Sequence, residues 1–200
     1  MDLMVKIYIL HSGEKMKFIK LESERLIYRK FDEKDFPVVF DWVSNVENMK
    51  YREGPLNESQ ARGYLNFLIS CTNAEDITHC EYAVARKSDN KLVGSTVFMN
   101  LPDKPEIGWT LHRDYWRQGY GTEMGRTMLK LGFDILNLHR IIAVCHALNV
   151  ASYKIMERIG MRREAYFIKS NKDNSTVNNE WCDEVLYAIL QEEWRANIKI

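Results

Sequence analysis

The stretch Arg117-Gln118-Gly119-Tyr120-Gly121-Thr122-Glu123 decides how the rest of this chain is interpreted. It follows a short apolar run at residues 107–111 and opens a long segment with apolar residues at helical spacing. Two glycines separated by one residue let the backbone turn tightly and bring successive N–H groups together at the positive end of a helix. Such a turn can bind a phosphate group, although a glycine turn can also simply join a strand to a helix.

The spacing of Gly119, Gly121 and Gly125 also suits a dinucleotide-binding fold. That fold requires an apolar strand running directly into the first glycine and an acidic residue about twenty positions beyond it for the ribose. Here the charged segment 112–114 intervenes, and the ribose position falls in an apolar run around Ile141. The sequence therefore excludes a dinucleotide-binding unit.

A second motif, Asn149-Val150-Ala151-Ser152, is followed by a helical pattern that stops at Gly160. Together with the glycine loop it resembles the acetyl-CoA-binding core of the GCN5-related N-acetyltransferases (GNAT). The loop is also similar to that of the branch that acetylates the N-termini of ribosomal proteins. This resemblance covers residues 17–194 and implies a single-domain α/β fold: a mixed, mostly antiparallel central sheet flanked by helices, with splayed central strands that hold acetyl-CoA. Residues 1–16 would form an N-terminal extension and residues 17–200 the acetyltransferase domain.

Apolar periodicity predicts the order of the elements. The predicted strands cover residues 21–29, 81–85, 92–99, 105–111, 140–145, 162–168 and 181–189. The predicted helices begin near residues 32 and 57 and cover residues 120–137 and 149–160. The segment 140–145 is too continuously apolar for a half-exposed strand, so we expect it in the centre of the sheet.

The composition is that of a globular protein, with 46% apolar and 28% charged residues. Lys plus Arg equals Asp plus Glu at 28 each, which gives no electrostatic case for nucleic acid as a partner. The apolar run at residues 5–10 is too short for a membrane span. The four cysteines form no Cys-x-x-Cys pair, which indicates reduced thiols in a cytoplasmic protein. Cys145, His146 and His139 lack a regular zinc-ligand spacing, so we expect no metal site.

Acetyl transfer from a thioester to an amine needs a held donor, a neutral amine, a hydrogen-bond donor for the oxyanion and a proton for the departing thiolate. The resemblance implies that the donor is bound by Trp109, Thr110, Leu111, Arg117, Gln118, Gly119, Tyr120, Gly121, Thr122, Asn149, Ser152 and Arg158. The pantetheine arm would pair with the backbone of residues 109–111 like an extra strand. The pyrophosphate would lie on the glycine loop, so we predict that a side chain introduced at Gly121 occupies its place.

The residues that move protons are less clearly marked. Many GNAT enzymes have a tyrosine as general acid at the position of Met156, which cannot donate a proton. In the ribosomal branch a serine at the position of Ser152 is the candidate acid. For the proton of the amine the candidates are Glu106 and Glu164, either of which could also be an ordinary strand-edge charge. No cysteine is placed near the motifs, so we predict direct attack in a ternary complex without a covalent intermediate.

The sequence thus predicts an acetyl-CoA-dependent N-acetyltransferase that acts as a monomer or a homodimer. By the resemblance, the polar loop 45–55 forms one wall of the acceptor pocket, with Tyr51 and Arg52 as substrate-binding residues. The acceptor expected is the N-terminal α-amine of a ribosomal or other protein. The alternatives are a small amine, such as an antibiotic or a polyamine, and a non-catalytic CoA-binding sensor, which the absence of a tyrosine at Met156 favours.

Overall fold

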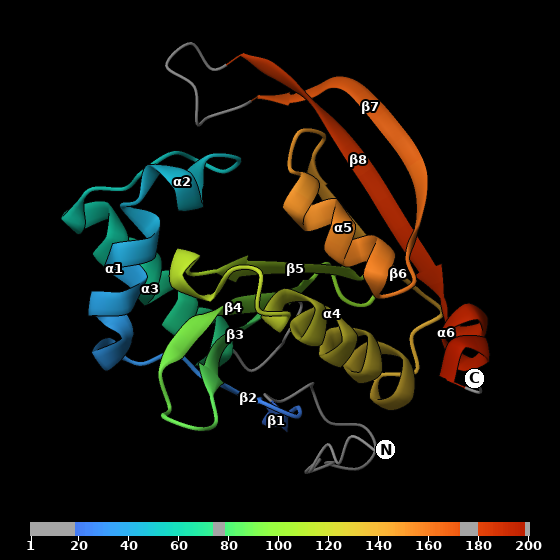
Figure 1. Cartoon of the computed structure of the whole chain (residues 1–200), viewed down its shortest axis with the longest axis horizontal. Helices are drawn as coiled ribbons and strands as arrows, with labels where there is room; N and C mark the ends of the chain where they lie inside the picture. The colour runs from blue at the N-terminus through green and yellow to red at the C-terminus, as the bar shows by residue number, and fades with distance from the viewer. Residues whose placement is uncertain (1–18, 74–78, 173–179, 199–200) are drawn as a thin grey trace.

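The computed structural model describes residues 19–73, 79–172 and 180–198. The predicted N-terminal extension and part of the loop before the last strand lie outside these ranges. An eight-stranded sheet, in the order β1-β2-β3-β4-β5-β6-β8-β7, forms the centre (Figure 1). Its strands are β1 (Leu21–Glu22), β2 (Leu26–Arg29), β3 (Cys80–Arg86), β4 (Leu92–Met99), β5 (Glu106–Leu111), β6 (Arg140–His146), β7 (Arg162–Lys172) and β8 (Trp181–Leu190). All neighbouring strands are antiparallel except β5 and β6, which confirms the mixed, mostly antiparallel sheet.

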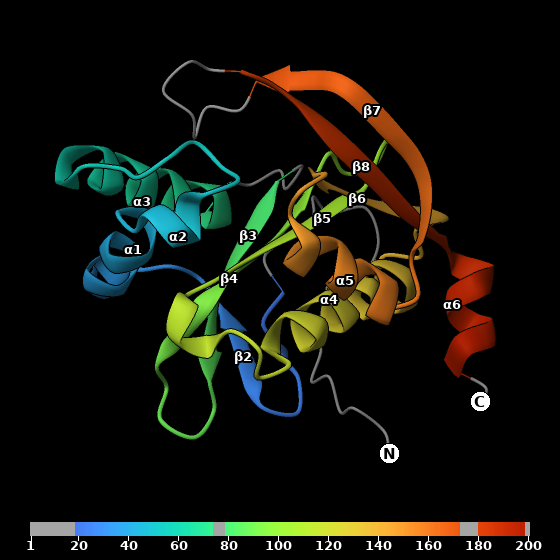
Figure 2. The same cartoon turned by 45° about the horizontal axis from the view of Figure 1, so that its top comes forward.

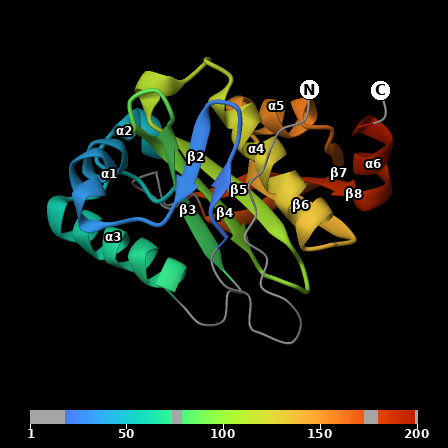
Figure 3. The same ribbon diagram turned by 90° about the horizontal axis from the view of Figure 1, so that it is seen from below.

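Helices cover both faces of the sheet (Figures 2 and 3). They are α1 (Phe36–Val43), α2 (Val46–Met49), α3 (Glu58–Asn73), α4 (Tyr120–Lys130), α5 (Val150–Arg158) and α6 (Gln191–Ile198). Alternation along β3 divides the core, because successive side chains of a strand point to opposite faces. Tyr82 and Val84 pack in the cluster that includes α4 and α5, whereas Ala83 packs in the cluster of α1 and α3.

Two predicted elements are divided in the structure. The strand expected over residues 21–29 is a tight hairpin of β1 and β2, closed by a hydrogen bond from Ser23 N–H to Leu26 O (2.9 Å). The helix expected over residues 120–137 is α-helical only to Lys130 and continues as a π-helical turn, Leu131–Ile135. The sheet position of residues 140–145 was predicted correctly, since β6 pairs with strands on both sides.

None of the helices in the described ranges combines the length and the apolar character that crossing a bilayer requires.

Candidate active site

The two central strands diverge. Among the described residues β5 and β6 are in register only at Glu106 and Ile142, where Ile142 N–H donates to Pro105 O (2.9 Å). Beyond that pair β5 continues to Leu111 beside β4, and β6 continues to His146 beside β8. We call the divergence between residues 107–111 and 143–146 the splay.

The splay leaves part of one backbone edge of β5 without a strand partner. His112 N–H donates to Val93 O (2.9 Å), so the even-numbered residues of β5 exchange backbone hydrogen bonds with β4. The backbone groups of Trp109 and Leu111 therefore point into the splay. Such an edge can pair with an extended amide-containing chain as a further strand would.

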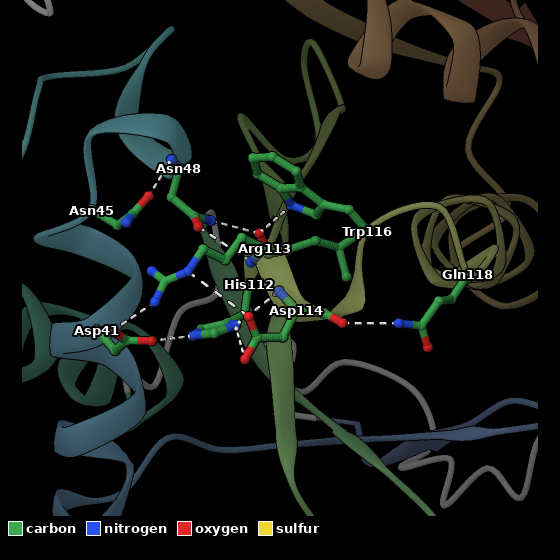
Figure 4. Close-up of polar contacts among 9 residues, drawn as sticks. Asp41, Asn45, Asn48, His112, Arg113, Asp114, Trp116 and Gln118 are labelled. Carbon is green, nitrogen blue, oxygen red and sulfur yellow. Dashed lines mark hydrogen bonds and ion pairs between the residues drawn. The ribbon is translucent and has the colours of Figure 1, made fainter.

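Side chains limit how far this edge is available. Leu111 O accepts two hydrogen bonds, from Asn48 Nδ2 (2.7 Å) and from Trp116 Nε1 (2.9 Å). Asn48 Oδ1 also accepts from Arg113 N–H (3.2 Å), so the side chain of one α2 residue holds the end of β5 at two points (Figure 4). Counting only partners in the described ranges, the groups of this edge left for a bound chain are the Trp109 N–H and C=O and the Leu111 N–H.

A buried histidine braces the same strand end against α1. His112 Nε2 lies 2.5 Å from Asp41 Oδ2, while its Nδ1 accepts from Asp114 N–H (3.3 Å), which makes Nε2 the protonated nitrogen (Figure 4). The hydrogen bond from His112, with the nearby Arg113 guanidinium, holds the pKa of Asp41 below its usual value. The segment that leads from β5 into the glycine loop is therefore fixed to the N-terminal half of the molecule.

The glycine loop makes a helix start with free amides. Gly119 has φ +82°, a conformation that suits glycine, and it is the N-cap of α4 without a capping side chain. The first N–H groups of an α-helix have no partner within the helix, so they are available to an anion here. The segment that precedes them is also turned, since Arg117 has φ +60°. A helix start of this kind could hold a phosphate group, and the phosphate cradle stays a prediction.

The prediction for Gly121 was wrong in its physical basis. Gly121 is buried, and a Cβ added there would lie 2.5 Å from Ile155 Cδ1 and 3.1 Å from Leu111 Cδ1. A side chain at this position would therefore point at α5 and β5 rather than at a phosphate group on the loop. Glycine at this position lets α4 approach α5 and β5 closely.

Arg25 and Glu123 link the β1–β2 hairpin to the glycine loop. The sequence analysis did not assign them this role. Glu123 accepts from Ser23 Oγ, Arg25 N–H and Arg25 Nε, each at 2.7 Å. Arg25 Nη1 donates to Gln118 O (3.0 Å), and the guanidinium lies 4.4 Å from the centre of the Tyr120 ring. The hairpin turn between β1 and β2 thus holds the loop in place through one carboxylate.

The second motif forms the start of α5. Asn149 is the N-cap, and its Oδ1 accepts from Ser152 N–H (3.1 Å). Ser152 is hydrogen-bonded to Cys145, whose thiol is buried enough to raise its pKa to about 11. The expectation that no cysteine lies near the motifs was therefore wrong, but a thiol that stays protonated at neutral pH is a poor nucleophile.

Met156 is buried in the core, and exposed Arg158 ends the helix, where its C=O accepts from Arg126 Nη2 (3.4 Å).

Comparison with known proteins identifies this arrangement. The model of the acetyltransferase (GNAT) domain family matches residues 25–162, which include β5, the glycine loop and α5. This chain belongs to the GNAT acetyltransferase family. It is 38% identical over 177 residues to the uncharacterized N-acetyltransferase YnaD of Bacillus subtilis, spanning 87% of this chain and 98% of that protein.

Solved GNAT structures share the fold. The acetyltransferase from Bacillus anthracis is 38% identical with a TM-score of 0.75, and the match covers 86% of this chain and 99% of that one. Ribosomal-protein-S5-alanine acetyltransferase from Vibrio fischeri (19% identity, TM-score 0.69, 88% and 99% covered) and spermidine N-acetyltransferase from Vibrio cholerae (18%, 0.70, 86% and 99%) share the fold at lower identity. The protein is therefore an N-acetyltransferase of a family that uses acetyl-CoA, and the fold does not decide its acceptor.

The structure separates the two carboxylates that were candidates for the general base of this GNAT protein. Glu106 lies where β5 and β6 part, and burial together with the charge of Glu184 raises its pKa. Glu164 lies on β7, three strand spacings away, which is roughly 14 Å. It is paired with Arg140 and with Arg162 (2.6 Å), and the hydrogen bonds from Arg140 lower its pKa. Of the two, only Glu106 combines a position at the splay with increased basicity.

The predicted acceptor wall reaches the splay through two contacts. Arg52 donates to Thr110 Oγ1 on β5, and the ring of Tyr51 lies 5.0 Å from that of His146 at the end of β6. His146, like Asn48 and Trp116, was not selected from the sequence as a site residue. Each is an isolated polar or aromatic side chain whose importance depends on strand register. The described residues contain no group of three or more His, Cys, Asp or Glu arranged to hold a metal ion.

Proposed function

We propose that this GNAT enzyme transfers the acetyl group of acetyl-CoA to the N-terminal α-amine of a protein. The observation that carries the proposal is the juxtaposition of three features: the open backbone edge at Trp109 and Leu111, the uncapped start of α4, and Glu106 at the apex of the splay. A thioester donor and an amine acceptor need these three functions in one place.

The donor would be held along β5 and the glycine loop. Backbone groups of Trp109 and Leu111 would pair with the amides of the pantetheine arm, and the amides of residues 119–122 would bind the pyrophosphate. Arg117 adds positive charge beside these amides, while Arg158 is the candidate for the adenosine 3′-phosphate. Asn149 and Ser152 contribute from the first turn of α5, which lies beside the end of β6.

Transfer requires a neutral amine. Glu106 would accept the proton of the acceptor ammonium, directly or through a water molecule, because its raised pKa makes the carboxylate more basic. A backbone N–H of β5 would stabilise the oxyanion as the amine nitrogen bonds to the carbonyl carbon. The C–S bond then breaks, and the nitrogen loses its second proton. Ser152 is the candidate that accepts this proton and donates its own to the departing thiolate.

The assignment of the acceptor rests on the similarity of the glycine loop to that of the ribosomal N-terminal branch. A small amine is the second candidate, since the same chemistry at Glu106 would serve it. A CoA sensor without catalysis is the third, because Met156 replaces the acid found in many relatives and is buried in the core.

The test is a calorimetric titration of the protein with acetyl-CoA, combined with an assay of free thiol released in the presence of N-terminal peptides or small amines. Binding with peptide-dependent thiol release supports the proposal, and release with small amines alone supports the second candidate. Binding without release by any amine, accompanied by an intact fold, would favour the sensor. No binding would refute the assignment of the glycine loop.

A further inference from the structure

The side chain of Asn48 is bonded to β5 as a neighbouring strand would be. Its Nδ2 donates to Leu111 O (2.7 Å), and its Oδ1 accepts from Arg113 N–H (3.2 Å) (Figure 4). In a parallel sheet, one residue of the next strand donates to the C=O of residue i−1 and accepts from the N–H of residue i+1. The Asn48 amide therefore takes the place of a strand residue opposite His112.

The opposite end of the same edge is closed by β6. Ile142 N–H donates to Pro105 O (2.9 Å), and Ile142 is the partner of Glu106 in the parallel pair. The edge of β5 thus has a strand residue at one end and a side-chain amide at the other. Counting partners within the described residues, Trp109 N–H, Trp109 C=O and Leu111 N–H lie unpaired between them. We call these three groups the open edge.

Asn48 is held by contacts that do not involve β5. Its own N–H donates to Oδ1 of Asn45, the N-cap of α2 (3.1 Å). The next residue, Met49, is buried in the core cluster of α1 and α3. The position of the amide is therefore set by α2 and the core, so a chain bound along β5 meets it as a fixed end.

The open edge has a definite complement. An N–H, a C=O and an N–H in succession pair with a carbonyl, an N–H and a carbonyl, which is the order along a chain with two amide groups. The pantetheine arm of an acyl-CoA is such a chain. An arm whose phosphates lie at the glycine loop approaches from the Asn48 end, because residues 112–118 lead from β5 to that loop. The Asn48 amide then prevents the arm from pairing nearer to the loop.

We infer that Asn48 is a positioning residue that fixes the register of the acyl donor on β5. This inference rests on the proposed function, in which the pantetheine arm pairs with this edge. With the amide in place, a single register uses all three groups of the open edge and directs the thioester toward Glu106. Without it, Leu111 C=O and Arg113 N–H become available, and the arm can pair one strand repeat, roughly 7 Å, nearer to the loop. Donor held in that second register is bound but does not react.

The register is measured by amide hydrogen exchange, followed by NMR with and without CoA. In the wild type, CoA should slow exchange at Trp109 and Leu111 and leave Arg113, which is already bonded to Asn48, unchanged. In Asn48→Ala, Arg113 N–H should exchange faster in the free protein. CoA at ten times its Kd should then slow it about tenfold, because binding lowers the exchanging fraction by the factor 1 + [L]/Kd. Asn48→Leu repeats the test with the side-chain volume kept.

Steady-state kinetics with acetyl-CoA give a second measurement. Unproductive binding lowers kcat and the KM for the donor by the same factor and leaves kcat/KM unchanged. The shifted register offers the arm as many backbone groups as the original one, so in Asn48→Ala both constants should fall about two- to tenfold, the factor of up to one net hydrogen bond. Asn48→Asp keeps an acceptor for Arg113 N–H and should retain the wild-type exchange at Arg113. Val46→Ala, at an exposed position of α2, is the matched control and should leave all values unchanged.

The inference would be overturned if CoA protected Trp109 and Leu111 in Asn48→Ala and Asn48→Leu while Arg113 continued to exchange fast. The arm would then keep its register without Asn48, and the proposed function would stand. A fall in kcat/KM at unchanged or raised KM would also overturn it, because that pattern indicates a damaged site. If CoA protected neither Trp109 nor Leu111 in the wild type, the placement of the donor in the proposed function would itself be refuted.

Discussion

Gly94 on β4 gives the sharpest test of how the donor strand is positioned. A Cβ added to Gly94 would lie 2.1 Å from Thr110 O and 3.0 Å from Leu111 Cα, both of which are main-chain atoms of β5. Real Cβ contacts are essentially never shorter than 3.0 Å, so β4 and β5 would have to separate locally by about 1 Å. Unlike a side chain, a hydrogen-bonded strand cannot rotate away.

For Gly94→Ala we therefore expect a loss of about 1–3 kcal/mol in the free energy of unfolding, the usual cost of overpacking. In a chain of this size that corresponds to a fall of roughly 2–12 °C in Tm. Displacement of the donor edge by about 1 Å should also lower kcat/KM about 100-fold, since misplacement of this size has such an effect on transfer. The measurements are thermal unfolding and acetyl-CoA-dependent thiol release.

Gly63→Ala is the matched control, because a Cβ at this α3 residue meets nothing within 4 Å. It should leave the rate unchanged and stabilise the helix by up to about 1 kcal/mol. If Gly94→Ala were as stable and as active as Gly63→Ala, the close approach of β4 to the Thr110 carbonyl would be refuted.

Substitutions at four further residues test the glycine loop, the two carboxylates and the thiol. Arg25→Ala removes side-chain donors to Glu123 and Gln118 and should weaken acetyl-CoA binding about tenfold by calorimetry, with only partial recovery in Arg25→Lys, which lacks the guanidinium fork. Glu106→Gln should lower kcat about 100-fold or more and remove the rise in rate as pH passes through the raised pKa, whereas Glu164→Gln should do neither. Because the folded-state pKa of Glu106 lies above its ordinary value of 4.5, its ionisation destabilises the fold at neutral pH. Glu106→Gln should therefore raise Tm at pH 7, and the difference should disappear below pH 4.5. Cys145→Ala should retain transfer activity, and wild-type Cys145 should react slowly with iodoacetamide at pH 7.5 and faster as pH approaches 11, as peptide mass spectrometry can follow.

These tests separate support of the site from chemistry at the site. Gly94 and Arg25 act on the position of main-chain donors, so their variants should change donor binding or alignment without altering the pH dependence. Glu106 is the residue whose removal should change the shape of the pH profile. A variant of Gly94 or Arg25 that shifted the profile would contradict this division.

The sequence by itself determined the family, the order of most elements and the residues of the two motifs. These signals are local: glycine spacing, apolar periodicity and the asparagine before α5 act over a few residues, so they can be recognised without knowing what lies across the sheet. The same local signals predicted that the helix after the loop starts at Tyr120 and that residues 140–145 lie inside the sheet.

Only the tertiary structure decided which of the candidates meet. From the sequence, Glu106 and Glu164 were equal candidates for the general base. Strand order places Glu106 at the splay and Glu164 beside Arg140 and Arg162. Cys145 lies beside Ser152, and Tyr51 beside His146, through contacts between segments that the sequence separates. The physical reason is that strand register fixes the face on which each side chain lies, and register depends on long-range pairing that no local pattern specifies.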